Sequence, residues 1–219
     1  YRAGGRAARF VRPVDRSELE AVAAGVASAG IPVLVVGRGS NLLVADGGFG
    51  GLALQLGQPF EKVRTEGTTV VAGAGVSLPV LARQTVAESL TGFEWAVGVP
   101  GSLGGAVRMN AGGHGSDMAT TLVSADTVDL ATGEGRRRTL ADLSLDYRSS
   151  SIEQSEVVVE ATMALAVGDM ASGEKRLAEV VRWRRENQPG GQNAGSVFTN
   201  PVGDSAGRLI DEAGLKGWR

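Results

Sequence analysis

The stretch of residues 92–115, GFEWAVGVPGSLGGAVRMNAGGHG, constrains the fold more than any other part of this chain. Eight of its 24 residues are glycine, and apolar residues such as Trp95, Leu103 and Met109 stand between them. Glycine loses more backbone freedom on folding than any other residue, so the run is costly in a plain core element. Main chain without Cβ atoms can instead approach a flat or phosphorylated ligand closely. A tight, buried crossover between sheets is the alternative interpretation of this central glycine-rich stretch.

A second glycine-rich loop, GRGSN at residues 37–41, follows the apolar run IPVLVV at residues 31–36. The run predicts a buried strand. Small residues and a hydroxyl directly after a strand are typical of phosphate-binding positions in α/β folds. This first glycine loop is not the dinucleotide fingerprint, because Leu42 replaces the third glycine, and it lacks the Gly-Lys-Ser or Gly-Lys-Thr of a P-loop. The two segments together predict a less usual way of holding a cofactor.

Four segments in order carry a resemblance to a known family: VVGRGSNLLVADGGFGGLALQL, GFEWAVGVPGSLGGAVRMNAGGHG, DYRSS and NAGSVFTNPVGDSAGRLIDEAGLKG. In them the chain resembles the UDP-N-acetylenolpyruvoylglucosamine reductases, the flavoenzymes of bacterial cell-wall precursor synthesis, and the similarity runs from the first residue to the last. The resemblance implies an α+β fold, with a two-subdomain FAD-binding fold of the vanillyl-alcohol-oxidase type followed by the start of an α+β substrate-binding domain. The expected divisions are residues 1–58, 59–168 and 169–219.

The residues themselves predict secondary structure that suits such a fold. Apolar residues at helical spacing predict a helix over residues 17–29, opened by a Ser17–Glu20 capping box and closed by Gly30. A second helix is expected from Ser77, its N-cap, to just before Gly92. We also expect strands at residues 31–36, 52–56, 69–75, 122–130, 136–140 and 157–167, the last three mainly antiparallel, and a helix at residues 174–187.

Composition narrows the functional classes. The chain has 219 residues, 42% of them hydrophobic, which allows one or two domains with a sizeable core. A net charge of −2 offers no basic surface for nucleic acid, and the absence of cysteine excludes disulfides, thiolate chemistry and a cysteinyl-flavin bond. No apolar run reaches the length of a membrane span. We expect a cytoplasmic monomer that binds no metal, nucleic acid or membrane.

Arg148 and Ser196 are the expected catalytic residues. From the residues alone, Arg148 would be an ordinary surface arginine and Ser196 a turn serine. The resemblance implies that Arg148 holds the substrate carboxylate and stabilises developing negative charge, which suits its permanent charge and forked donors. It implies that Ser196 is the proton donor, and that Tyr147, Arg148 and Asn200 bind the substrate.

The resemblance also implies noncovalent FAD as cofactor, NADPH as hydride donor, and reduction of UDP-N-acetylglucosamine enolpyruvate to UDP-N-acetylmuramate. The residues expected to bind FAD come from the two glycine-rich segments. They are Val36, Gly37, Arg38, Gly39, Ser40, Asn41 and Leu42, followed by Gly98, Val99, Pro100, Gly101, Ser102, Gly104, Gly105, Ala106, Met109, Asn110 and Gly112.

Two alternatives stay open: an FAD-binding but inactive fragment, and a flavin-dependent oxidase of the same wider fold, which would not need the GSVFTNP segment. The chain also departs from the family pattern. Thr199 stands where a lysine is usual, and the family's C-terminal glutamate would lie beyond Arg219, so we expect the C-terminal end to be lacking. For His114, the only histidine, we expect a surface or supporting role, and for the arginines at residues 136–138 a solvated sheet edge.

Overall fold

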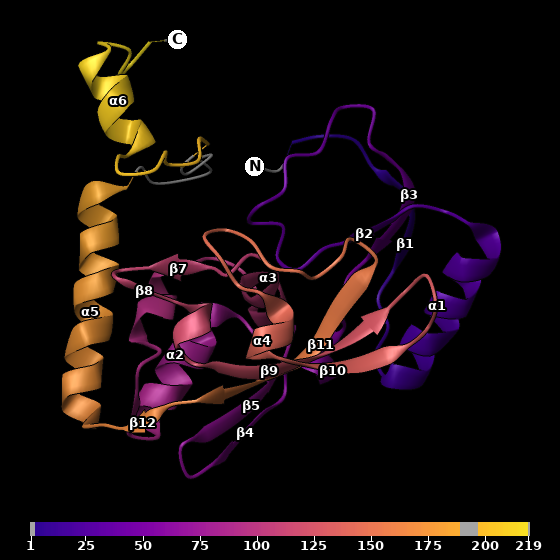
Figure 1. Ribbon diagram of the computed structural model, residues 1–219, viewed down its shortest axis with the longest axis horizontal. Coiled ribbons are helices and arrows are strands. Elements are labelled where there is room, and N and C mark those ends of the chain that lie inside the picture. The colour runs from indigo at the N-terminus through magenta and orange to yellow at the C-terminus, as the bar shows by residue number, and fades with distance from the viewer. Residues whose placement is uncertain (1–2, 189–196, 219) are drawn as a thin grey trace.

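The computed structural model describes residues 3–188 and 197–218. Its body holds a three-stranded parallel sheet of order β1-β3-β2 and a five-stranded antiparallel sheet of order β10-β9-β11-β5-β4 (Figure 1). Two short antiparallel pairs, β12 with β6 and β7 with β8, are also present. The α+β class expected from the sequence is therefore confirmed. None of the helices in the described parts of the chain is long and apolar enough to cross a membrane.

The secondary structure is distributed along the whole described chain. The strands are β1 (Ala7–Val11), β2 (Val33–Val35), β3 (Phe49–Leu54), β4 (Val63–Glu66), β5 (Thr69–Gly73), β6 (Leu90–Thr91), β7 (Gly112–Gly113), β8 (Ser116–Asp117), β9 (Leu122–Asp129), β10 (Gly135–Thr139), β11 (Glu156–Ala164) and β12 (Ala166–Val167). The helices are α1 (Arg16–Ala29), α2 (Leu78–Ala87), α3 (Leu103–Arg108), α4 (Leu140–Leu143), α5 (Met170–Asn187) and α6 (Ala206–Glu212), with 3-10 turns η1 (Gln58–Glu61), η2 (Glu94–Gly98) and η3 (Met118–Thr120).

Helix α1 packs its apolar face, including the fully buried Leu19, against the parallel sheet. The predicted closure is confirmed, because Gly30 adopts a left-handed conformation (φ 59°) and its N–H bonds the carbonyl of Val26. The predicted Ser17–Glu20 capping box is wrong. Asp15 is the N-cap, and its carboxylate accepts a hydrogen bond of 2.8 Å from the backbone N–H of Glu18. A carboxylate two residues upstream of Ser17 satisfies one of the free N–H groups and so starts the helix earlier.

A larger core lies between the antiparallel sheet and the elements α2, η2, α3 and α5. Phe93, Leu103 and Met163 are completely buried in it. Figure 1 shows α5 as a long helix along one side of the molecule, next to α2. Most of the central glycine-rich stretch therefore runs through the interior and supplies core side chains.

Three expected boundaries are corrected, two by strand pairing and one by a local helix cap. Helix α2 ends at Ala87 instead of running to Gly92, because Ser89 turns left-handed (φ 58°) and Leu90 pairs with Val167. The expected strand 157–167 is two strands, since β11 pairs with β5 and β9 whereas β12 pairs with β6. Helix α5 begins at Met170 because the carboxylate of Asp169 caps it through the N–H of Ser172.

Strand β10 is an edge strand, as the arginine run predicts. Arg136 is solvent-exposed and pairs with the neighbouring Glu134. Arg138 instead reaches the buried Glu156, with a distance of 2.8 Å between Nη1 and Oε2. It also donates to the carbonyl of Asp142, so this arginine ties α4 to the sheet. Arg136 is therefore a solvated charge, whereas Arg138 supports the structure.

Candidate cofactor and substrate site

The first glycine loop and the central glycine-rich stretch lie against each other. Ser40 Oγ donates a 3.0 Å hydrogen bond to the carbonyl of Pro100. A Cβ atom at Gly37 would lie 2.4 Å from Ser102 Oγ, so a side chain there would displace its neighbour. Gly101 has a φ of 144°, a conformation that residues with side chains rarely adopt. Two segments that are 60 residues apart in sequence thus form one surface.

Backbone and amide hydrogen bonds fix the start of the first glycine loop. The N–H of Val36 donates to the carbonyl of Leu54 at 2.7 Å, which continues the β2–β3 pairing to the edge of the loop. Gln55 Nε2 then donates to the carbonyl of Gly37 at 2.7 Å, and Gln55 is itself held by Arg12. The loop therefore leaves the sheet in a defined direction, with its glycines exposed or half-buried.

The central glycine-rich stretch is held just as firmly on the other side. The N–H of Leu103 donates to the carbonyl of Val76, and that of Gly104 to the carbonyl of Ala74, each at 2.9 Å. These bonds pack α3 onto the segment that directly follows β5. The side chain of Ser102 is buried beneath the contact with the first glycine loop.

A small cavity of about 230 Å³ adjoins the first glycine loop. Val36, Gly39 and Leu42 line it together with Leu34 and Phe49, so its wall is apolar. Binding pockets that enclose a whole small molecule usually measure about 300–1,000 Å³. The cavity is therefore suited to one flat ring system of a larger ligand, with the remainder lying over the exposed backbone. The residues present thus fit a cofactor with an aromatic ring and phosphates.

The residues expected to bind FAD divide by burial. Gly98, Ser102, Ala106 and Asn110 are buried, so their side chains support the loops from within. The others are exposed or half-buried: Val36, Gly37, Arg38, Gly39, Ser40, Asn41, Leu42, Val99, Pro100, Gly101, Gly104, Gly105, Met109 and Gly112.

Arg148 lies in a tight turn, residues 146–149, which we call the Arg148 turn. Asp146 and Ser149 exchange backbone hydrogen bonds of 3.1 Å, and Arg148 between them is left-handed with a φ of 56°. Its Nη2 lies 3.4 Å from the carbonyl oxygen of Gly112, at the end of the glycine-rich stretch. The exposed ring of Tyr147 lies 5.6 Å from the guanidinium carbon. The structure thus brings Tyr147 and Arg148 to the segment expected to bind the cofactor.

The two remaining candidate residues are not joined to this turn. Ser196 lies outside the described residues. Asn200 is exposed, and its Oδ1 accepts a 3.0 Å hydrogen bond from the N–H of Ala206 at the start of α6. No hydrogen bond links Asn200 with Tyr147 or Arg148 in the described part of the chain.

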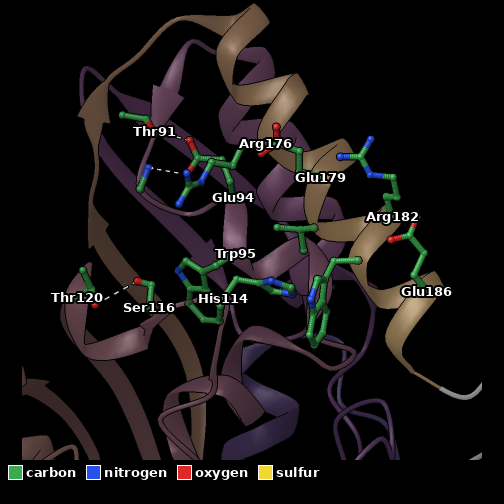
Figure 2. Close-up of a pocket in the computed structure, with 14 residues that line it drawn as sticks. Thr91, Glu94, Trp95, His114, Ser116, Thr120, Arg176, Glu179, Arg182 and Glu186 are labelled. Atoms are coloured by element: carbon green, nitrogen blue, oxygen red, sulfur yellow. Dashed lines mark hydrogen bonds between the residues drawn. The ribbon is translucent and has the colours of Figure 1, made fainter.

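A larger groove of about 790 Å³ lies elsewhere, between η2, the β7–β8 turn and α5 (Figure 2). None of the residues expected to bind FAD or substrate lines it. His114 and Trp183 meet there edge to face, with their ring centres 5.1 Å apart. Burial, followed by the charges of Arg184 and Arg176, lowers the pKa of His114, so the imidazole is neutral at neutral pH.

Glu94 lies at one end of this groove and is 7% exposed. Burial acts to raise the pKa of its carboxyl, but hydrogen bonds from Thr91 Oγ1 and from the N–H of Gly92, with the charge of Arg176, outweigh it and lower the pKa. Sequence reasoning missed this residue and the groove. The groove's walls come from separate segments, and the sequence pattern gives no sign that α5 folds across them.

Comparison with known proteins identifies the family of the chain. A family described as "FAD binding domain" matches residues 7–138, and "UDP-N-acetylenolpyruvoylglucosamine reductase, C-terminal domain" matches residues 187–219. The crystal structure of UDP-N-acetylenolpyruvylglucosamine reductase from Thermus caldophilus superposes with a TM-score of 0.84 at 35% identity, covering 96% of this chain and 74% of that one. The family match and the superposed fold therefore define an FAD-binding flavoprotein.

The similarity to individual proteins is more specific. The chain is 42% identical over 222 residues to UDP-N-acetylenolpyruvoylglucosamine reductase 2 of Symbiobacterium thermophilum, covering all of this chain and 71% of that protein. It is 43% identical over 223 residues to the reductase of Heliobacterium modesticaldum, of which it covers 70%. The chain belongs to the UDP-N-acetylenolpyruvoylglucosamine reductase family, a family of FAD-dependent oxidoreductases. The resemblance found in the sequence is thus confirmed.

Proposed function

We propose that this chain reduces UDP-N-acetylglucosamine enolpyruvate to UDP-N-acetylmuramate with NADPH as the hydride donor. The observation that carries the proposal is the position of Arg148. Its guanidinium is exposed and lies beside Gly112, at the end of the stretch that faces the first glycine loop. A permanently charged, forked donor next to a flavin-binding surface suits a substrate that carries a carboxylate.

Arg148 would bind the substrate carboxylate and stabilise the negative charge that develops when hydride reaches C3 of the enolpyruvyl group. Donors that are already oriented toward developing charge act without reorganisation during the reaction. Ser196 would then protonate C2, and Tyr147 and Asn200 would contact the substrate. A serine hydroxyl is a weak acid, so this transfer requires a strongly basic carbon and close approach.

The exposed backbone of residues 36–42 and 98–112 would hold FAD, and Val36, Gly39 and Leu42 would enclose one of its rings in the small cavity. Bound FAD would supply the hydride-transfer chemistry between NADPH and the substrate. Ser40 and Ser102 would keep the two segments together during both steps. We further propose the divisions 1–58, 59–168 and 169–219, and a monomer in the cytoplasm, where the pathway's nucleotide-linked precursors are made.

An anaerobic titration in one cuvette tests the proposal. The purified chain, loaded with FAD, is mixed first with NADPH and then with UDP-N-acetylglucosamine enolpyruvate. We expect the flavin absorbance to bleach and then to return. Absorbance that bleaches without returning contradicts the proposal and favours the FAD-binding, inactive alternative. Rapid reoxidation by oxygen together with no response to the substrate would favour the oxidase.

An Arg148→Met variant sharpens the test. It keeps the length of the side chain and removes the charge, so reoxidation by the substrate should slow by at least about a hundredfold, as when a charge-stabilising donor is lost. Bleaching by NADPH should be unchanged. The matched control is Arg64→Met, an exposed arginine on β4 whose ion pair with Glu160 is solvated.

A further inference from the structure

We propose that Asn110 is a positioning residue that sets the orientation of Arg148. The inference rests on the proposed role of Arg148. Asn110 follows α3 within the central glycine-rich stretch, and it is 5% exposed. It is one of a few residues other than glycine with a positive φ, at 37°. A buried polar side chain in a conformation that disfavours most residues is retained when it makes specific contacts.

The amide of Asn110 joins three segments of the chain. Its Nδ2 donates to the carbonyl of Asp146 at 3.1 Å and to Oδ2 of Asp117 at 3.2 Å. Its Oδ1 accepts from the N–H of Ala119 at 3.0 Å. Both N–H groups and the oxygen are thus used, so the side chain has a single favourable orientation.

The bond to Asp146 is the one that reaches Arg148. The carbonyl of Asp146 also accepts the hydrogen bond from Ser149 that closes the Arg148 turn. Its carboxylate accepts from the N–H of Tyr147 at 2.7 Å. Asn110 therefore holds the residue on which the turn is built, and the left-handed conformation of Arg148 follows from that turn.

A second set of bonds secures the far side of the turn to the same helix end. Ser150 Oγ donates to the carbonyl of Arg108 at 2.6 Å. Arg108 Nη1 donates to the carbonyl of Ile152 at 2.9 Å. Figure 1 shows α3 near the centre of the molecule, and the segment between α4 and β11 passes beside it.

These hydrogen bonds determine how far the guanidinium of Arg148 lies from the surface proposed to bind the cofactor. Ser40 binds the central glycine-rich stretch at Pro100, and Asn110, further along the same stretch, binds the Arg148 turn. One rigid segment therefore sets the separation between the first glycine loop and the guanidinium of Arg148. Catalysis depends steeply on such placement, since a displacement of about 1 Å can cost about a hundredfold in rate.

Asn110→Gly tests the proposal, because glycine tolerates the positive φ and removes only the amide. Amide hydrogen exchange of the chain without substrate is the first measurement. We expect the exchange rate of the Ser149 N–H to rise about tenfold, in line with the loss of a buried hydrogen bond. Exchange in α5 should not change. Equal protection of Ser149 in both proteins would overturn the proposal, and so would a similar loss of protection throughout the chain.

Stopped-flow kinetics of the FAD-loaded chain are the second measurement. Reoxidation by the enolpyruvyl substrate should slow by about ten- to a hundredfold, whereas reduction by NADPH should keep its rate. In an Arg148→Met background the same change should alter reoxidation by less than about threefold, because the two residues act through one contact. If the two substitutions instead slow reoxidation by factors that multiply in the double variant, Asn110 does not act through Arg148.

Two further variants complete the test: one should disturb the same contact, and the other is a control that should not. Asn110→Asp retains the shape but turns a donor into an acceptor facing two other acceptors, so it should disturb the Arg148 turn at least as much. Asn187→Ala removes an exposed amide from the end of α5 and should alter neither measurement. If the unmodified chain is bleached by NADPH but never reoxidised by the substrate, the proposed function fails, while hydrogen exchange still decides the role of Asn110.

Discussion

The two glycine-rich segments look alike in sequence and differ in what their glycines do. In the central glycine-rich stretch, every residue from Phe93 to Gly98 is buried. A Cβ at Gly104 would lie 2.9 Å from the Cβ of Ala74. In and near the first glycine loop, Gly39 and Gly47 face open space. Glycine therefore permits close packing at Gly104 and leaves backbone accessible at Gly39, and only the surroundings distinguish the two positions.

Loss of a core side chain from the central stretch should have the largest effect. Phe93 is fully buried and contacts Trp95 edge to face, with ring centres 5.3 Å apart. Phe93→Ala should lower the free energy of unfolding by about 3–5 kcal/mol, measured by chemical denaturation. Leu43→Ala, at a residue that is 77% exposed beside the first glycine loop, should change it by less than about 0.5 kcal/mol. If both variants lost a similar free energy of unfolding, the two segments would not differ in their contribution to the core.

Adding volume within α3 tests the packing role directly. Gly104→Val should cost about 1–3 kcal/mol in unfolding free energy, because the helix would have to move away from Ala74, directly after β5. Gly105→Ala is the matched control, since its Cβ would meet only Ser102 Oγ at 3.5 Å. Thermal denaturation of both variants measures the difference in their stability. A control as unstable as the valine variant would mean that helix flexibility, and not close packing, requires glycine here.

A substitution in the first glycine loop should change the affinity of the chain for FAD. A Cβ at Gly37 would lie 2.4 Å from Ser102 Oγ, so Gly37→Ala should push the two segments apart. We expect FAD binding to weaken by about tenfold, equivalent to about 1.4 kcal/mol, in a fluorescence titration. Gly47→Ala, which meets open space, should bind FAD normally. Unchanged affinity in the Gly37 variant would remove the first glycine loop from the cofactor site.

Glu94 should give the smallest effect, and only in acid. Its pKa in the folded chain is lowered from an ordinary value of 4.5, so the unfolded chain takes up a proton first as the pH falls. The carboxylate therefore stabilises the fold above pH 4.5, and this contribution is lost as the pH drops through the lowered pKa. Glu94→Gln should cost about 0.5–1 kcal/mol at pH 7 and flatten the acid side of the stability curve.

Denaturation at a series of pH values, with the exposed Glu66→Gln as control, measures this effect. The control should leave the curve unchanged. An unaltered acid slope in the Glu94 variant would contradict the assignment of the lowered pKa to this carboxyl.

Sequence patterns predicted the elements whose formation depends on neighbouring residues. The helix before Gly30 and the strand before the first glycine loop are both present, because helical spacing and β-branched runs act locally. The capping of α1 and the end of α2 were not predicted correctly. Asp15 competes with Ser17 for the cap, and the pairing of Leu90 with Val167 depends on residues far away in the chain.

By itself, the sequence determined the family, the α+β class and the FAD-binding character, because ordered motifs carry that information without coordinates. Only the tertiary structure decided what the motif residues contact. It placed Arg148 beside Gly112 and used both N–H groups and the oxygen of the Asn110 side chain to connect distant segments. Contacts of this kind depend on how separate elements pack, and a polar residue gives no sign in the sequence of whether its partner will be a ligand, water or another part of the chain.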